Sequence, residues 1–185
     1  MSYNVSSANR IATSNPVVYL IISIMTAYSH SKSIVVRGLR SLGCLAWAER
    51  NALGIVRLVA PTMTELLGRQ TLHDEIYLSA CILCQNLYVH KACILKGPSF
   101  LPSLIRRIDP VEVPSRILLA ALNALLNVAF YQHDGMRRCL RQHGAILLCR
   151  KVRDATPSNK PSCYIDLHLI IYKYIYINIY IYIYI

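Results

Sequence analysis

The sequence predicts an all-α fold, in which about three repeated helical units and a partial one stack into a right-handed α–α superhelix. Three similar segments begin at Gly38, Ala80 and Ala121, and their starts lie 42 and 41 residues apart. Each segment lies in a longer stretch whose apolar residues recur at helical spacing. Because a single helical hairpin of this kind cannot bury its apolar stripe, neighbouring units have to cover it.

The composition is that of a folded chain with a strong basic bias. Of its 185 residues, 55% are hydrophobic and 16% are charged, which excludes disorder for the bulk of the chain. Lys and Arg outnumber Asp and Glu by 20 to 9, and the net charge of +11 favours an acidic peptide, a phosphorylated segment, an anionic membrane or nucleic acid. The seven cysteines, an odd number mostly within apolar helical patterns, indicate reduced thiols and a cytoplasmic or nuclear setting.

The first elements are a polar N-terminus and a short apolar helix. Residues 1–14 are expected to be disordered, and Pro16–Met25 is expected to be helical with Asn15 as a possible cap. The apolar run Val17–Ala27 could also be a signal-peptide core, but Tyr28-Ser29-His30 is a poor cleavage context. The run is too short to cross a bilayer as a helix.

The segments between the long helices also recur. Each unit is expected to contain a long apolar helix, a short helix, a Gly or Pro break and a medium helix. Asp109 is a plausible cap for the third long helix, and Pro110 and Pro114 fit the entry to it, because proline is tolerated in a first turn. Acidic Asp74 and Glu75 suit the start of the second. The connecting pairs are Ile55–Val59 with Met63–Leu67, Ala92–Gly97 with Leu101–Ile105, and Met136–Gly144 with Ala145–Leu148.

The period near 41, the small-apolar runs that end in Asn-Leu or Asn-Val, and the break before the medium helix resemble the armadillo repeat family. A HEAT-like stack is the alternative. The resemblance covers residues 15–153 and implies that Pro16–Met25 belongs to an earlier, incomplete repeat. The Trp that nuclear-import adaptors carry four residues before the Asn is absent here. The third, groove-lining helix of the family would correspond to Ser31–Trp47, His73–Tyr88 and Asp109–Phe130.

Residues 154–185 depart from the repeat. A linker rich in Pro and Ser leads into strict Ile/Tyr alternation, which is what translation of an alternating A/T tract gives. We therefore interpret the tail as a readthrough or gene-model end. A membrane anchor over Leu167–Ile185 is a second interpretation, although His168, Lys173 and Asn178 interrupt it. A packed terminal hairpin or strand is a third.

No metal, cofactor or catalytic site is predicted. Cys81, Cys84, His90 and Cys93 carry zinc-binding side chains, but the first two fall inside an apolar helix without the tight turn that a zinc site needs. Buried core cysteines and a junction histidine are the preferred interpretation. Acid–histidine neighbours such as those around His73 do not face one another on a helix, and the chain has no phosphate-binding loop or nucleophile elbow. An enzyme is therefore not expected.

One face of the long helices is the candidate binding groove. Residues at spacings of 3, 4, 7 and 11 share a helix face. Asn86 and Asn127 occupy equivalent positions, where the first unit has Cys44. The resemblance implies that such an Asn grips the backbone of an extended peptide, because its amide offers a donor and an acceptor. Alternatively, both satisfy backbone groups within the stack. The predicted groove residues are Arg37, Arg40, Ser79, Ile82, Asn86, Arg116, Asn123 and Asn127.

The leading functional hypothesis is a non-enzymatic scaffold that binds an extended acidic partner segment in this groove. Its asparagines would capture the main chain and its arginines would supply charge complementarity. A second basic cluster, Arg106 and Arg107 with the basic residues from 137 to 153, is either a solvated face or a dock for an acidic or phosphorylated peptide. The alternatives are a basic helical module that binds nucleic acid or an anionic membrane, and a truncated product without independent function.

Overall fold

The computed structural model describes residues 16–69, 72–96, 100–108, 113–130 and 142. These residues form seven α-helices and no strand, so the all-α prediction is confirmed for the described part of the chain. In chain order the helices are α2 (Pro16–Ala27), α3 (Lys32–Leu45), α4 (Glu49–Gly68), α5 (Asp74–Leu87), α6 (Lys91–Lys96), α7 (Leu101–Arg107) and α8 (Ser115–Phe130).

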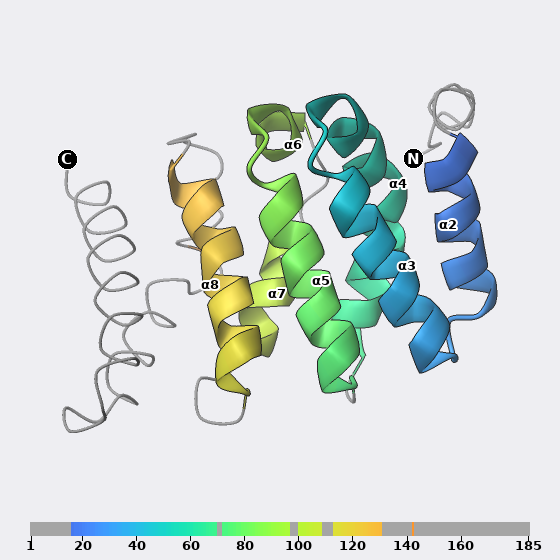
Figure 1. The fold of residues 1–185 in the computed structure, drawn as a ribbon. Helices are drawn as coiled ribbons and strands as arrows, with labels where there is room; N and C mark the ends of the chain where they lie inside the picture. The colour runs from blue at the N-terminus through green and yellow to red at the C-terminus, as the bar shows by residue number, and fades with distance from the viewer. Residues whose placement is uncertain (1–15, 70–71, 97–99, 109–112, 131–141, 143–185) are drawn as a thin grey trace, which may run out of the picture.

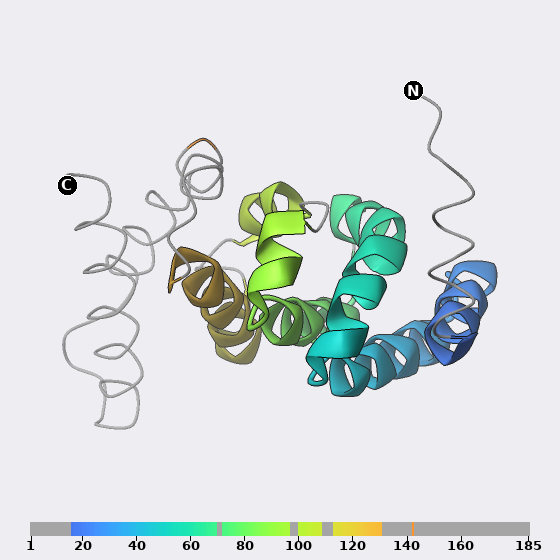
Figure 2. The same cartoon turned by 90° about the horizontal axis from the view of Figure 1, so that it is seen from above.

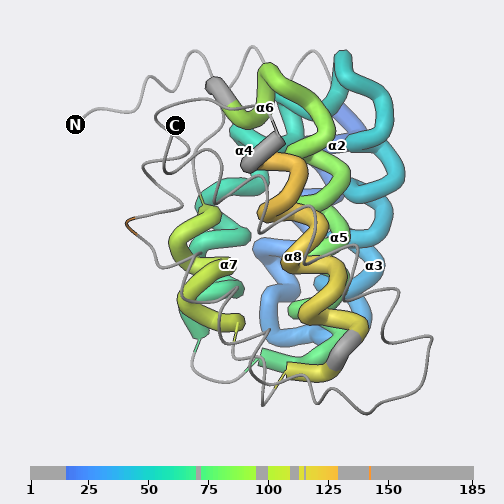
Figure 3. Tube along the Cα trace, turned by 90° about the vertical axis from the view of Figure 1, so that its left-hand side faces the viewer, coloured from blue at the N-terminus to red at the C-terminus, as the bar shows by residue number. Residues whose placement is uncertain are grey.

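The helices are arranged in two layers. Helices α3, α5 and α8 lie side by side and point in the same direction, with α5 in contact with both neighbours (Figure 1). Helices α4, α6 and α7 lie behind this row, as the view from above shows (Figure 2). The side view separates the same two layers (Figure 3). Helix α2 lies at the N-terminal edge and contacts α3 and α4. The chain therefore adds one long helix to the front row with each successive unit.

The core is continuous between the two layers because each helix turns an apolar stripe toward it. On α3 the stripe includes Val35, Leu39 and Leu42, which are spaced so that they share one face. Helix α5 is buried on more sides because α3 and α8 flank it. Its Leu83 and Leu87 are fully buried, and burial of such a side chain contributes roughly 1.5–3 kcal/mol.

The first connecting segment differs from the prediction of a short helix, a break and a medium helix. Helix α4 runs without interruption through Pro61. In the second unit the two helices are separate, since α6 ends at Lys96 and α7 begins at Leu101. Proline alone removes one backbone donor and bends a helix. The second unit has a Gly-Pro pair at 97–98, where the first unit has a single proline. Glycine favours a break in a helix, and a residue that precedes proline disfavours the helical conformation.

The start of α8 also differs from the prediction. The helix was expected from Asp109, but Pro114 lies just outside it, and the carbonyl oxygen of Pro114 accepts bonds from the backbone N–H groups of Ile117 and Leu118. Ser115 is therefore the first helical residue. Asp74 and Glu75 do lie in the first turn of α5, as predicted. Outside the described residues lie the predictions for residues 1–14, Asn15, Asp109, Pro110, the third connecting segment, the basic residues from 137 to 153 and the tail 154–185.

A close approach fixes α2 on α3. A methyl group at Gly38 would overlap the side chain of Met25, which is fully buried. Only a residue without Cβ lets Met25 lie flat against α3 at this point. Gly38 is therefore a packing residue of the α2–α3 contact.

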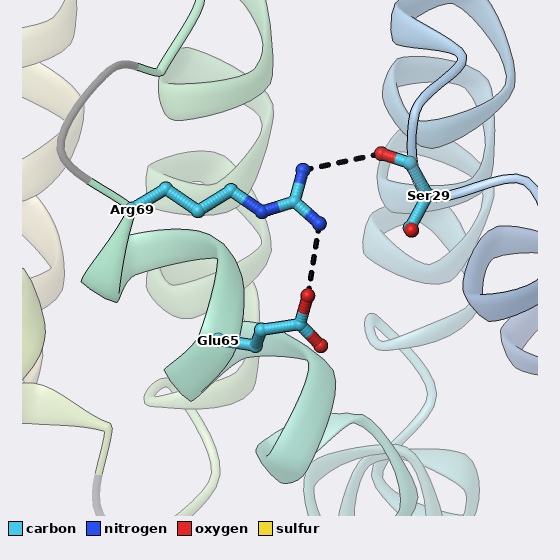
Figure 4. A network of polar contacts seen from close by, with 3 residues as sticks. All are labelled: Ser29, Glu65 and Arg69. Carbon is cyan, nitrogen blue, oxygen red and sulfur yellow. Dashed lines mark hydrogen bonds and ion pairs between the residues drawn. The ribbon is translucent and has the colours of Figure 1, made fainter.

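Arginine side chains link the ends of successive connecting helices. Arg69, the residue after α4, donates from Nη1 to the carbonyl oxygen of Ser29 at 3.2 Å and pairs with Glu65 at 2.9 Å (Figure 4). Ser29 follows the end of α2. Arg107, at the end of α7, donates in turn to the carbonyl oxygen of Arg69 and lies 5.6 Å from the ring centroid of Tyr77. The same kind of contact therefore joins each unit to the one before it.

Candidate functional site

The exposed face of the row α3, α5 and α8, here called the outer face, carries most of the predicted groove residues. Arg37 and Arg40 are exposed on α3, and Arg116 is exposed on α8. Glu75 and Ile82 are exposed on α5 between them. Because the three helices are parallel neighbours, equivalent positions on them lie next to one another across this face.

Glu75 interacts with basic side chains from both neighbouring helices. The Nζ atom of Lys32 lies 2.9 Å from its carboxylate. The hydrogen bond and the charge of Lys32 lower the pKa of Glu75, and the charges of Arg40 and Arg116 lower it further. Glu75 is therefore paired with one cation and feels the charge of two more, which come from α3 and α8. The exposed cations Lys32, Arg37, Arg40 and Arg116 outnumber the exposed carboxylates Asp74 and Glu75 on these three helices.

The two asparagines of the predicted groove bond to the helix of the preceding unit. Asn86 is 8% exposed, and its Nδ2 donates to the carbonyl oxygen of Gly43 at 3.1 Å. Asn127 is partly exposed, and its Nδ2 donates to the carbonyl oxygen of Gln85 at 2.9 Å. Gly43 and Gln85 both lie among the last four residues of their helices, whose carbonyl groups lack partners within the helix. Each asparagine therefore caps the C-terminal turn of the neighbouring long helix.

His90 makes a third contact of this type. Its Nε2 donates to the carbonyl oxygen of Ala46 at 2.7 Å, which requires the proton to be on Nε2 because a carbonyl only accepts. Asn86 and His90 together satisfy two carbonyl groups at the end of α3. The bonds of Asn86 and Asn127 correspond to the alternative stated from the sequence, in which both asparagines satisfy backbone groups within the stack.

The remaining groove residues differ in accessibility. Ser79 is buried, and its hydroxyl donates to the carbonyl oxygen of Glu75 at 2.7 Å, so its side chain does not lie on the outer face. Asn123 is partly exposed on α8 at the position equivalent to Ile82 on α5. The side chains of the outer face available to a partner are therefore mainly those of the arginines, Ile82 and Asn123.

Sequence reasoning missed two residues near the groove. Lys32 was left out of the groove, although it makes the only direct ion pair with Glu75 among the described residues. Trp47 is 67% exposed in the turn after α3, and it is the chain's single tryptophan. Trp is one of the residue types enriched at interface hot spots. Spacing could have identified Trp47, because it follows Arg40 by seven residues, about 10 Å along a helix.

Three of the four cysteines in the described residues lie in the core. Cys81 and Cys84 are buried in α5, and burial raises the pKa of both thiols well above the usual range. Burial also raises the pKa of Cys93 to about 11. Cys44 is exposed. Within the described residues, no group of three or more His, Cys, Asp or Glu residues is arranged to hold a metal ion.

None of the helices in the described ranges combines the length and the apolar run that a bilayer crossing requires. The outer face has three notable features: the ion pair between Lys32 and Glu75, the asparagine bonds between successive long helices, and an exposed Trp47 in the turn after α3. Compared with protein-family models, curated proteins and solved structures, the chain has no match.

Proposed function

We propose that the chain is a non-enzymatic scaffold whose outer face binds an extended acidic segment of a partner protein. One observation carries the proposal. Lys32 pairs directly with Glu75, and the charges of Arg40 and Arg116, on the two helices that flank α5, also act on this carboxylate. Cations that outnumber their carboxylate on an accessible face favour an anionic ligand.

We further propose that the described helices are part of an armadillo-like right-handed solenoid. The equivalent bonds Asn86 to Gly43 and Asn127 to Gln85 support this, because they recur between successive long helices one unit apart. The arginine contacts at the opposite ends of the units recur as well. A stack in which every unit bonds in the same way to its predecessor is what a repeat architecture requires.

In the proposed mechanism, arginine and asparagine side chains have separate roles. The planar forks of Arg40 and Arg116 bind partner carboxylates, a geometry that suits guanidinium groups. Ile82, which lies exposed between them on α5, contacts an apolar side chain of the partner. Asn123 bonds to the partner main chain. Asn127 contributes through its carbonyl oxygen, since one N–H of its amide already caps α5.

The experiment is a binding titration with a Glu-rich peptide and its Gln-substituted counterpart. Intrinsic Trp47 fluorescence reports binding, because this residue is the chain's only tryptophan and is exposed. We expect the double variant Arg40→Ala with Arg116→Ala to lose affinity on the order of tenfold or more, which corresponds to about 1.4 kcal/mol. The matched control is the double variant Arg50→Ala with Arg57→Ala, which removes two exposed arginines from α4 in the other layer.

The outcomes separate the candidate partners. Binding of the Glu-rich peptide that requires Arg40 and Arg116 but not Arg50 and Arg57 supports the proposal. Equal loss in all variants would show that binding follows net charge rather than the outer face. Tighter binding of an RNA or DNA oligonucleotide, with a steep loss of affinity on adding salt, would favour the nucleic-acid alternative. Binding to anionic vesicles alone would favour the membrane alternative.

A further inference from the structure

Three side chains at equivalent positions form a line across the outer face. Arg40 on α3, Ile82 on α5 and Asn123 on α8 are 42 and 41 residues apart, the same shifts that relate the repeated segments. Arg40 is exposed, Ile82 is 38% exposed and Asn123 is partly exposed. A cation, an apolar side chain and an amide therefore follow one another from helix to helix. These three residues are here called the cross-face line.

The asparagine bonds between the long helices fix the register of the cross-face line. Asn86 donates to Gly43 on α3, and Asn127 donates to Gln85 on α5, so the shift between bonded residues is 43 in one pair and 42 in the other. These shifts agree with those of the line to within one residue. The line lies about one helical turn before the bonds, so its three side chains are level with one another across the row.

The distance between packed helices selects the conformation of a segment that would follow this line. Helix α5 packs on both α3 and α8, and packed helix axes are about 8–10 Å apart. In polyproline II, with about three residues per turn and a rise of about 3.1 Å, every third side chain returns to the same face after about 9.3 Å. In a β-strand the side chains of one face recur after about 6.6 Å and about 13 Å. Only the polyproline II repeat matches the helix spacing.

We propose that the outer face selects a polyproline II segment in which an acidic residue and an apolar residue lie three positions apart. This inference rests on the proposed function, because it specifies the acidic segment that the same face binds. The acidic residue pairs with Arg40, and the apolar residue contacts Ile82, so that charge and polarity are complementary along the line. A polar residue three positions further meets the amide of Asn123, which offers a donor and an acceptor.

The positions next to the line make the apolar contact selective. Ser79 and Ala120, three residues before Ile82 and Asn123, are small and buried, so they do not project beside it. Within α5, all of whose residues are described, Ile82 is the only large apolar side chain that is exposed. A segment with a different spacing therefore finds no second apolar contact on this helix.

The test compares three end-blocked peptides of identical length, composition and charge by isothermal titration calorimetry with the full chain. Their sequences are Pro-Glu-Pro-Pro-Leu-Pro-Pro-Glu-Pro, Pro-Pro-Glu-Pro-Leu-Pro-Glu-Pro-Pro and Glu-Pro-Pro-Pro-Leu-Pro-Pro-Pro-Glu, which place Glu three, two and four positions from Leu. Proline holds all three peptides in the polyproline II conformation. Because Glu lies on both sides of Leu, each peptide presents its spacing in both chain directions.

We expect the peptide with a spacing of three to bind at least about tenfold tighter than the other two, because it alone presents Glu and Leu on one face. Arg40→Ala and Ile82→Ala are each expected to reduce this preference to within about threefold. The matched control is Arg57→Ala, which removes an exposed arginine from α4 in the other layer and is expected to keep the preference.

Three results would overturn this inference. The first is equal affinity of the three peptides, or binding of none of them by a chain that binds the Glu-rich peptide. The second is tightest binding at a spacing of two or four. The third is a preference for three that persists in both Arg40→Ala and Ile82→Ala. In each case binding of the Glu-rich peptide that requires Arg40 and Arg116 would leave the proposed function standing, whereas loss of that binding would remove both.

Discussion

Replacing Asn86 with alanine removes the donor that caps the end of α3, and the structure sets the size of the effect. The carbonyl group of Gly43 lies in the last turn of α3, and Gly43 is buried. The N–H of Trp47, which would reach this carbonyl in a longer helix, donates to Cys44 at 3.4 Å instead. The substitution therefore leaves a buried carbonyl without its side-chain donor.

The expected cost follows from two effects. A net hydrogen bond contributes about 0.5–1.5 kcal/mol, and a buried polar group left unpaired costs about 1–3 kcal/mol. Because the two overlap, we expect Asn86→Ala to lower the free energy of unfolding by about 1.5–3 kcal/mol. Asn86→Asp keeps the shape but places a second acceptor against the carbonyl of Gly43, so it is expected to cost more than alanine.

The assay is urea unfolding followed by circular dichroism at the helix band, with Asn123→Ala as the matched control. Asn123 is an asparagine on the same face of a long helix and is partly exposed. Its side chain makes no hydrogen bond to the described residues, and its substitution is expected to change stability by less than about 0.5 kcal/mol. Equal unfolding midpoints for Asn86→Ala and Asn123→Ala would refute the capping role of Asn86.

Two further predictions concern packing and thiol chemistry. Gly38→Ala is expected to destabilise the chain by about 1–3 kcal/mol, because the added methyl group overlaps a buried methionine of α2. Gly68→Ala, where a Cβ meets nothing within 4 Å, is expected to be neutral or slightly stabilising in the same thermal melt. Iodoacetamide at mildly alkaline pH is expected to label Cys44 first and Cys81 much later, as peptide mapping would show. Labelling of Cys93 should still increase as the pH rises toward its pKa of about 11, and a plateau near pH 9 would contradict the burial of this thiol.

Periodicity was sufficient to predict the helices but not the breaks between them. The 42-residue shift places α3 and α5 correctly because apolar spacing reports directly on which face a helix buries. Pro61 was expected to end a helix, yet α4 continues through it. A single proline costs one backbone hydrogen bond, and the packing of the 20-residue helix on its neighbours outweighs that cost.

The sequence predicted the charged residues of the candidate site but not the hydrogen bonds that its polar side chains make. The exposed arginines Arg40 and Arg116 follow from helix-face spacing alone. Spacing fixes the direction of a side chain, but it does not say whether a neighbouring helix has an unpaired carbonyl within reach. That is why the sequence could not choose between a peptide grip and a cap for Asn86. Ser79 illustrates the same limit, since its small side chain is covered by the neighbouring helices.

Binding of an acidic segment by the outer face can be tested with the single substitution Glu75→Gln. The carboxylate of Glu75 competes with an acidic partner for Lys32, Arg40 and Arg116. Its removal therefore leaves these cations to the partner. We expect several-fold tighter binding of the Glu-rich peptide to Glu75→Gln in the Trp47 fluorescence titration, and no change for Glu49→Gln in α4. Unchanged or weaker binding to Glu75→Gln would contradict this binding mode.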